Sequence, residues 1–261
     1  MDDAALPITE HLTELRSRLA WILGAMLLGT ALSFNQAEAI FGFLVDPVMA
    51  ALPEGTKLQA IRPTEIFITY LWCAVLAGFL FALPVFFFHV WRFIAPGLYP
   101  DEKRMVVPFV VFSSGLFGGG AIFGYTMVFP VVFGFFTSFD SGFAESAWTM
   151  SEVFSLTTKL FLAFGVAFEL PIAVFFLSIS GLVTARQLLA GTPYAVLGMF
   201  VLGAMLTPPD IISQVMLAIP MVGLYLLGVG VAWLFGGNRE PAEDGDSATS
   251  EAATRPEDSD G

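Results

Sequence analysis

Long apolar runs separated by short polar stretches make up most of this chain. A run of about 20 apolar residues, folded as a helix, is long enough to cross a hydrocarbon layer of roughly 30 Å. The pattern therefore predicts an all-α polytopic membrane protein with six transmembrane helices in one membrane domain, residues 1–235. The expected spans are 18–34, 65–91, a segment within 105–139, 160–182, 193–206 and 211–235.

The stretches beside the first two spans have expected structure of their own. Residues 7–18 carry leucines on one helical face and charged residues on another, which indicates a short amphipathic helix at the membrane interface. The apolar patch 39–45 is expected to form a surface helix within the polar stretch 35–64. Pro84 is expected to kink the second span.

The region 105–139 has 35 residues and no charge, which is more than one crossing needs. We expect about 20 of these residues to cross the membrane and the chain to turn near Pro130. A polar loop is expected over 140–159. The fifth span has only 14 residues, which cover about 21 Å as a helix, and the proline-rich break 207–210 joins it to the sixth. Such a short pair is expected either to thin the bilayer locally or to hide its ends against protein.

Lysine and arginine counts predict the orientation. With the N-terminus inside, seven of these residues lie near span ends on the inner side and three lie on the outer side. Because basic residues favour the cytoplasmic side, both termini are expected in the cytoplasm. Residues 236–261 hold eight acids and two bases. Their net charge of −6 is half of the formal net charge of −12 of the whole chain. This composition predicts an acidic, disordered tail.

Few residues in this chain are suited to chemistry. The two histidines lie in different segments without the spacing of a metal site, and the single cysteine, Cys73, lies within an apolar run. The sequence contains no phosphate-binding glycine loop, no nucleophile elbow and no basic patch suited to nucleic acid. We therefore expect no catalytic residues, no metal, no cofactor and no nucleic-acid partner.

Glu169 is the sharpest polar signal within the apolar runs. An acid at mid-membrane costs about 2.5–3.5 kcal/mol on insertion scales, so its side chain should face the bundle interior, a cavity or a partner helix. It is either a site that meets a partner or a proton, or a structural acid bonded within the bundle. Two GxxxG spacings, Gly115–Gly119 and Gly120–Gly124, indicate either close helix packing or simple glycine richness.

A polar island, WRFIAPGLYPDEKR at 91–104, separates the second and third runs. Its acids Asp101 and Glu102 would lie at the positive end of the third helix, which is a sufficient structural role. Alternatively they receive guanidinium groups, which carboxylates bind through paired, charge-assisted hydrogen bonds. Glu14 also has two interpretations. It supports its own helix by pairing with Arg18, or it joins Glu102 on one membrane face to bind a ligand with more than one arginine.

Five segments of the chain carry a recognisable set of motifs in a fixed order. They are HLTELRSRL at 11–19, RPTEIFITYL at 62–71, VWRFIAPGLYPDEKR at 90–104, AFGVAFELP at 163–171 and LTPPDIISQ at 206–214. Together they resemble the twin-arginine translocase subunit TatC. The resemblance implies a concave six-helix bundle with short fifth and sixth helices, in the inner (cytoplasmic) membrane of a bacterium, with both termini in the cytoplasm.

The resemblance also implies a function and partners. The protein would not be an enzyme. It would recognise twin-arginine signal peptides of folded precursors and export them with TatB- and TatA-type single-span subunits, in a larger self-associating complex driven by the proton-motive force. The signal-peptide-binding residues would be Glu14, Arg16, Arg18, Phe93 and Glu102. Pro47 would be a functional residue of the first far-side loop. The polar residues that contact partner helices within the membrane would be Glu169, Thr207 and Gln214.

The expected mechanism is one of binding and scaffolding. The acids would capture the arginine pair, the apolar part of the signal would enter the concave face, and partner helices would gather near Glu169. The alternative is an ion-coupled secondary transporter with Glu169 as the relay. That alternative predicts internal repeats with paired broken helices, and the two halves of the sequence show no convincing similarity.

Overall fold

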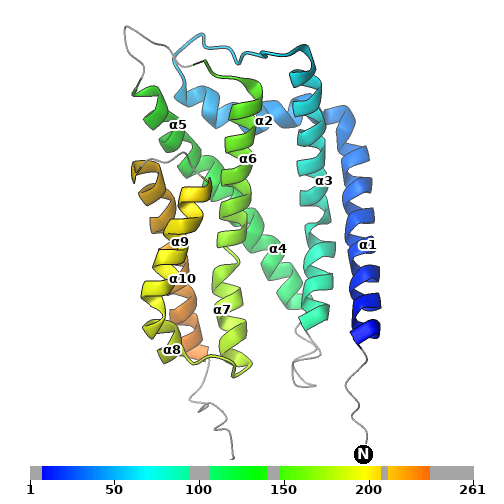
Figure 1. Cartoon of the computed structure of the whole chain (residues 1–261), viewed down its shortest axis with the longest axis vertical. Helices are drawn as coiled ribbons and strands as arrows, with labels where there is room; N and C mark the ends of the chain where they lie inside the picture. The colour runs from blue at the N-terminus through cyan, green and yellow to red at the C-terminus, as the bar shows by residue number, and fades with distance from the viewer. Residues whose placement is uncertain (1–7, 95–105, 140–146, 207–210, 236–261) are drawn as a thin grey trace, which may run out of the picture.

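A computed structural model of the protein describes residues 8–94, 106–139, 147–206 and 211–235 (Figure 1). The secondary structure of this part is helical, apart from one isolated bridge between Gln59 and Thr149, so the expected all-α fold is confirmed there. The elements in chain order are α1 Ile8–Ser33, the 3-10 segment η1 Phe34–Gln36, α2 Ala37–Ala51, α3 Pro63–Ile94, α4 Val106–Phe123, the π-helical segment η4 Gly124–Val128, α5 Phe129–Thr137, α6 Met150–Ala167, α7 Leu170–Ile179, α8 Ala185–Ala190, α9 Thr192–Leu206 and α10 Ile211–Phe235.

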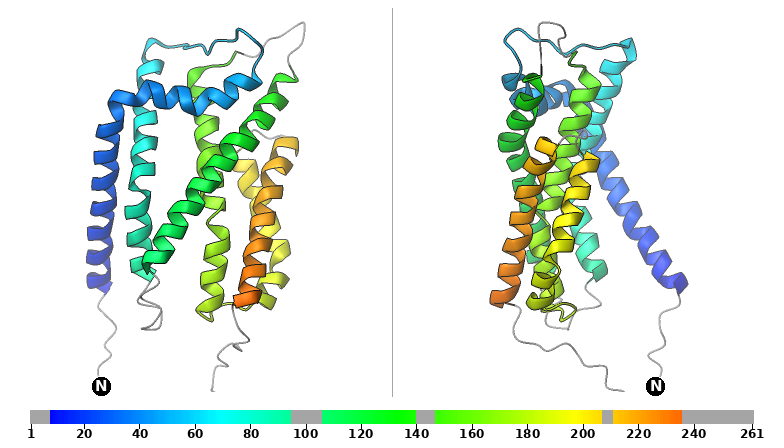
Figure 2. Two further views of the ribbon diagram at one scale, coloured as in Figure 1. Left: turned by 180° about the vertical axis from the view of Figure 1, so that it is seen from behind. Right: turned by 60° about the vertical axis from the view of Figure 1, so that its left-hand side comes forward.

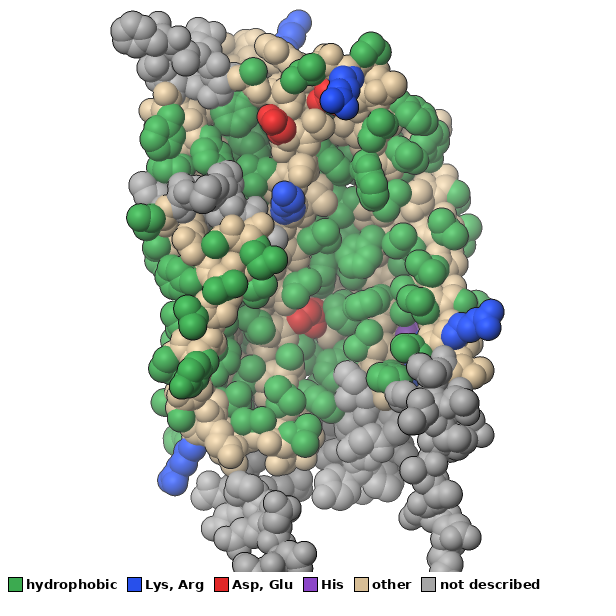
Figure 3. All heavy atoms as spheres, in the orientation of Figure 1, with side chains coloured by type: hydrophobic (Ala, Val, Ile, Leu, Met, Phe, Trp, Pro, Cys, Tyr) green, Lys and Arg blue, Asp and Glu red, His purple; other side chains and the backbone are tan. Residues whose placement is uncertain are grey.

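Apolar helices long enough to cross a membrane make up most of the described chain. Five stretches meet that length and composition, namely 13–51, 63–93, 106–137, 150–178 and 214–234. The helix at 192–205 is apolar but shorter, as the sequence predicted for the fifth span. Many of their large apolar side chains are exposed, and Figure 3 shows a mostly hydrophobic surface with isolated charged side chains. Such a surface is typical of a protein whose solvent is lipid.

The first two helices meet at one end of the bundle. The predicted N-terminal helix and first span form one continuous helix, α1. The short η1 segment then redirects the chain, and α2 lies across the end of the bundle (Figures 1 and 2). The predicted surface helix is confirmed and is longer than expected. It buries Phe41, Leu44 and Val48, which share one helical face because they are three or four positions apart.

The prediction that the chain turns near Pro130 is wrong. α4, η4 and α5 form one helical stretch of 32 residues that crosses the bundle obliquely (Figures 1 and 2). Such a stretch is about 48 Å long at 1.5 Å per residue, and an oblique path shortens its projection across a membrane. Pro130 lies in the first turn of α5, directly after the π-helical segment. A local π adjustment accommodates the missing proline N–H without ending the helix.

The prediction of a loop over 140–159 is also wrong from residue 150 onward. α6 begins at Met150 and includes Lys159. Thr149 is its N-cap, and the backbone N–H of Glu152 donates to the Thr149 hydroxyl at 3.3 Å. A threonine followed three residues later by glutamate is a helix-start signal in the sequence. The hydropathy pattern misses this helix start because the charged residues Glu152 and Lys159 precede the apolar run.

Glycines decide how closely two helix pairs approach. A Cβ on Gly78 in α3 would lie 2.5 Å from the backbone nitrogen of Thr30 in α1, and a Cβ on Gly120 in α4 would lie 2.3 Å from the carbonyl oxygen of Phe164 in α6. A Cβ on Gly115 or Gly119 would meet nothing within 4 Å. Only the second GxxxG spacing therefore contributes to packing against α6, and the first faces open space.

Two short helices, α7 and α8, lie between α6 and α9. Glu169 lies two positions after the end of α6 and directly before α7, which has Pro171 in its first turn. The connection between the expected spans 160–182 and 193–206 contains a helix, α8, which begins with a capping box between Thr184 and Gln187. Pro84, at which the sequence predicts a kink in the second span, lies inside α3, and the helix continues past it.

Candidate functional site

A buried arginine joins the start of α1 to the end of α3. Arg18 is only 9% exposed, although arginine is rarely buried without partners. It donates to the carbonyl oxygen of His89 at 2.9 Å and to that of Arg92 at 3.5 Å, and it forms an ion pair with Glu14. Its guanidinium carbon lies 5.7 Å from the centre of the Phe93 ring. We call these five residues the arginine clamp.

Local helix chemistry explains the arginine clamp. Glu14 and Arg18 are four positions apart on α1, with the acid first, which is the favourable order for an ion pair along a helix. Arg92 is one of the last four residues of α3, so its carbonyl oxygen has no partner within that helix and is open to a basic side chain. The His89 carbonyl lies one turn earlier and accepts from Arg18 through its second lone pair. Arg18 therefore satisfies the end of α3 and holds it against α1.

The arginine clamp brings together some of the predicted signal-binding residues. Glu14, Arg18 and Phe93 meet there, although they come from different helices. The Glu14 side chain remains 52% exposed, so a ligand can reach its carboxylate. Arg16 is exposed on the same helix, outside the arginine clamp. Glu102 lies outside the described residues.

Glu169 lies at the junction of α6 and α7. Its carboxyl group interacts with the hydroxyl of Ser113 and the backbone of Phe117, both in α4. Trp91, near the end of α3, donates its indole N–H to the Ser113 hydroxyl at 3.0 Å. The acid is thus partly bonded within the bundle, as one of its two predicted interpretations requires.

The other predicted site residues lie elsewhere. Pro47 is half-buried inside α2, at the opposite end of the bundle from the arginine clamp (Figure 1). The Gln214 side chain donates to the carbonyl oxygen of Phe200 at 2.9 Å and so connects α10 to α9. Thr207 lies outside the described residues. Glu169 and Gln214 therefore belong to the α6–α7 junction and to α10, whereas the arginine clamp belongs to α1 and α3.

One protein-family model matches most of the chain. Residues 10–220 match the family model described as TatC, Sec-independent protein translocase protein. This chain belongs to the TatC family. It is therefore a subunit of a Sec-independent protein translocase, a multi-pass membrane protein of protein transport.

Relatives and solved structures agree with the TatC assignment. The TatC protein of Desulforapulum autotrophicum is 39% identical over 248 residues, covering 95% of this chain and 92% of that one. The TatC protein of Azotobacter chroococcum is 40% identical over 246 residues, covering 94% and 96%. Two crystal structures described as twin arginine translocase receptor TatC, one of them in DDM, have a TM-score of 0.77 and 35% identity. They cover 86% and 85% of this chain, and 98% and 99% of their own chains are covered.

A second set of contacts in this TatC-family chain was not predicted from sequence. At the end of the bundle where α2 lies, the Glu65 carboxylate accepts from the backbone N–H of Ile61 at 2.8 Å and from that of Ser151 at 3.0 Å. Gln59 exchanges backbone hydrogen bonds with Trp148 and Met150, at 2.8 and 2.9 Å. These contacts attach the connection after α2 to the start of α6. The sequence signal that could have indicated a structural role for Glu65 is its place as an acid in the first turn of the second expected span.

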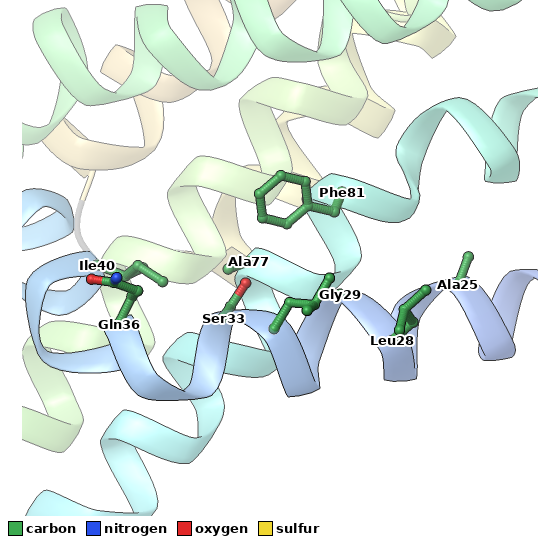
Figure 4. Close-up of a pocket in the computed structure, with 9 residues that line it drawn as sticks. Ala25, Leu28, Gly29, Ser33, Gln36, Ile40, Ala77 and Phe81 are labelled. Atoms are coloured by element: carbon green, nitrogen blue, oxygen red, sulfur yellow. The ribbon is translucent and has the colours of Figure 1, made fainter.

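An apolar groove of about 500 Å³ runs between α1 and α3 near η1 (Figure 4). Leu28, Leu32 and Phe81 form much of its wall, and the polar side chains of Ser33 and Gln36 lie at one end.

Within the described parts of this TatC-family chain, no group of three or more His, Cys, Asp or Glu side chains could hold a metal ion.

Proposed function

We propose that this TatC-family chain recognises twin-arginine signal peptides through the carboxylate of Glu14 and the ring of Phe93. The observation that carries the proposal is that an arginine of the protein itself, Arg18, pairs with Glu14 and lies over Phe93. A carboxylate and an aromatic ring are both favourable partners for a guanidinium group. Because Glu14 is half-exposed, an arginine of a signal peptide could approach the same carboxylate from solvent.

Glu102 would complete this recognition site. It lies in the connection between α3 and α4, and α3 ends at the arginine clamp, so the connection leaves from the site itself. A second carboxylate there would suit the second arginine of the signal. Arg16 is exposed and would contact the peptide directly. The crystal structures that resemble this chain are described as receptors, which agrees with a binding function.

The proposal includes a topology. The chain would cross the bacterial inner membrane six times, with α9 as the short fifth span and both termini in the cytoplasm. α1 begins and α10 ends at the same end of the bundle (Figures 1 and 2), which supports an even number of crossings. The arginine clamp lies at that end and would face the cytoplasm. The acidic residues 236–261 would then follow α10 there as a solvated tail.

The remaining parts of the proposal concern partners and energy. TatB- and TatA-type single-span subunits would contact the membrane-embedded part near Glu169, Thr207 and Gln214, in a larger complex that contains several copies of the chain. Export of folded precursors would use the proton-motive force. Pro47 would act at the opposite, far-side end.

Photo-crosslinking tests the recognition site. A photoreactive residue replaces Leu15, which is 47% exposed beside Glu14. The full complex is incubated with a precursor whose signal carries Arg-Arg or Lys-Lys. Lysine keeps the charge but loses the planar fork, so we expect about a tenfold lower yield with Lys-Lys or with Glu14→Gln. Glu38→Gln, which changes an exposed acid at the other end of the bundle, is the matched control.

Equal yields from both signals and both variants would show that Glu14 only supports its helix, and the recognition proposal would be abandoned. Uptake of a small solute by this chain alone, unaffected by signal peptides, would instead support the ion-coupled transporter.

A further inference from the structure

A chain of polar side chains connects α3 and α4 to Glu169 inside the bundle. Trp91 is 7% exposed and donates its indole N–H to the Ser113 hydroxyl oxygen at 3.0 Å. Ser113 is fully buried, and its side chain also interacts with the Glu169 carboxyl group. The sequence motifs assigned no role to Ser113 or to the Trp91 indole.

The hydrogen-bonding capacities of these groups set a direction. An indole N–H can only donate, whereas a serine hydroxyl has one hydrogen and two acceptor lone pairs. Because the Ser113 oxygen accepts from Trp91, its own hydrogen can donate to Glu169, which lies next to it. The carboxyl oxygen Oε1 of Glu169 is buried without a hydrogen-bond partner among the described residues. Besides Ser113, the carboxyl group interacts with the backbone of Phe117, so two contacts from α4 set its orientation.

We propose that Trp91 and Ser113 are positioning residues that hold the Glu169 carboxyl group in its working orientation. The proposal rests on the proposed function, in which Glu169 meets partner helices. A hydroxyl that is itself fixed by a donor offers its hydrogen in one direction, and buried polar networks of this kind specify a single arrangement when their members are satisfied.

Aromatic packing keeps the donor in place. The Trp91 ring stacks on Phe109 of α4 at 4.6 Å between centroids and meets Phe176 of α7 edge-on at 5.3 Å. The indole therefore cannot rotate away from Ser113 without separating three helices. Trp91 also precedes Phe93 by two residues at the end of α3. A movement of this last turn at the arginine clamp displaces the backbone that carries the donor, which provides a route from the signal-binding site to the intramembrane acid.

Four substitutions separate hydrogen bonding from packing. Trp91→Phe removes the N–H and keeps a stacking ring, and Ser113→Ala removes the hydroxyl. Ser113→Thr restores a hydroxyl at the same position. Ser114→Ala is the matched control, because the hydroxyl of Ser114 in the same helix is buried but has no hydrogen-bond partner among the described residues.

The structural readout is the indole N–H resonance of Trp91 in the ¹⁵N-labelled full-length protein in detergent, assigned by its loss in Trp91→Phe. We expect this resonance to shift in Ser113→Ala and also in Glu169→Gln, because replacing the carboxylate reorients the serine hydroxyl. It should stay unchanged in Ser114→Ala. A resonance that ignores both Ser113→Ala and Glu169→Gln would overturn the hydrogen-bond chain.

The functional readout is the export rate of a twin-arginine reporter in cells that contain the full translocase. We expect Trp91→Phe and Ser113→Ala each to slow export about threefold to tenfold, as loss of one interhelical hydrogen bond in a membrane protein does. Ser113→Thr should restore most of the rate. In a Glu169→Gln background the two substitutions should have no further effect, because they act through the carboxyl group.

The outcomes distinguish this proposal from the proposed function. Equal fold losses in the wild-type and Glu169→Gln backgrounds would show that Trp91 and Ser113 act through packing alone and would overturn the positioning role. Normal export by Glu169→Gln would remove that acid from the proposed function and the positioning role with it. Failure of Glu14→Gln to affect signal crosslinking would overturn the recognition proposal and leave the positioning result standing.

Discussion

Replacement of Arg18 by glutamine tests whether the arginine clamp is structural. Glutamine is shorter, carries no charge and cannot reach the His89 carbonyl, the Arg92 carbonyl and Glu14 together. The matched control is Arg16→Gln, the same chemical change two positions earlier on α1, where the side chain is exposed. The two variants therefore differ in burial and contacts but not in lost charge.

The contacts of Arg18 set the expected magnitude. The 2.9 Å bond to the His89 carbonyl is a hydrogen bond from a charged donor, worth about 1.5–3 kcal/mol. The 3.5 Å contact with the Arg92 carbonyl is at the limit of hydrogen bonding and adds little. The ion pair with half-exposed Glu14 adds about 0.2–1 kcal/mol, and the contact with the Phe93 ring about 0.5–1 kcal/mol. We expect Arg18→Gln to lower the free energy of unfolding by about 2–5 kcal/mol.

The single cysteine supplies the assay. Cys73 is fully buried in the core, so a thiol-reactive fluorophore labels it only when the helices separate. Heating the purified protein in detergent with this fluorophore reports the unfolding temperature without any introduced cysteine. Arg18→Gln should lower that temperature by roughly 4–20 °C, given a loss of about 2–4 °C per kcal/mol for proteins near this size. Arg16→Gln should change stability by no more than about 0.5 kcal/mol.

Similar unfolding temperatures for Arg18→Gln and Arg16→Gln would refute the structural role of Arg18. Arg18 would then return to the role that the family resemblance suggests, a direct contact with the signal peptide. A large fall in stability that Arg18→Lys does not recover would support the fork-shaped contact with two carbonyls, because lysine keeps the charge but binds as a point charge.

Two further predictions concern helix packing and helix starts. Gly120→Ala should destabilise the protein by about 1–3 kcal/mol, because its Cβ would overlap the Phe164 carbonyl. Gly119→Ala should be neutral or slightly stabilising. Thermal unfolding in detergent compares the two variants, and equal effects would contradict the packing argument. Thr149→Ala should cost about 1 kcal/mol through loss of the N-cap to Glu152, and Thr149→Ser should recover most of it. Hydrogen exchange at the start of α6 checks this, since unchanged protection in Thr149→Ala would exclude a capping role.

Part of the site could be predicted from the sequence, and the reasons differ between residues. Glu14 and Phe93 lie in motifs that resemble the TatC family, and the structure places both in the arginine clamp. The same motif contains Arg16 and Arg18, and nothing in the local sequence shows that one is exposed and the other buried. That difference depends on which face of α1 meets the end of α3. Ser113 was not predicted because one serine in an apolar run has no recognisable pattern.

The sequence by itself determined the all-helical class and the approximate position of most apolar helices, because hydrophobicity and length decide which segments a bilayer can hold. It also determined the TatC family through its motifs. Only the tertiary structure decided the oblique path of α4 and α5, the contact of Gly120 but not Gly119 with α6, and the burial of Arg18. The physical reason is that hydropathy measures the transfer of a segment into lipid, whereas tilt, close approach and burial depend on the side chains that neighbouring helices present.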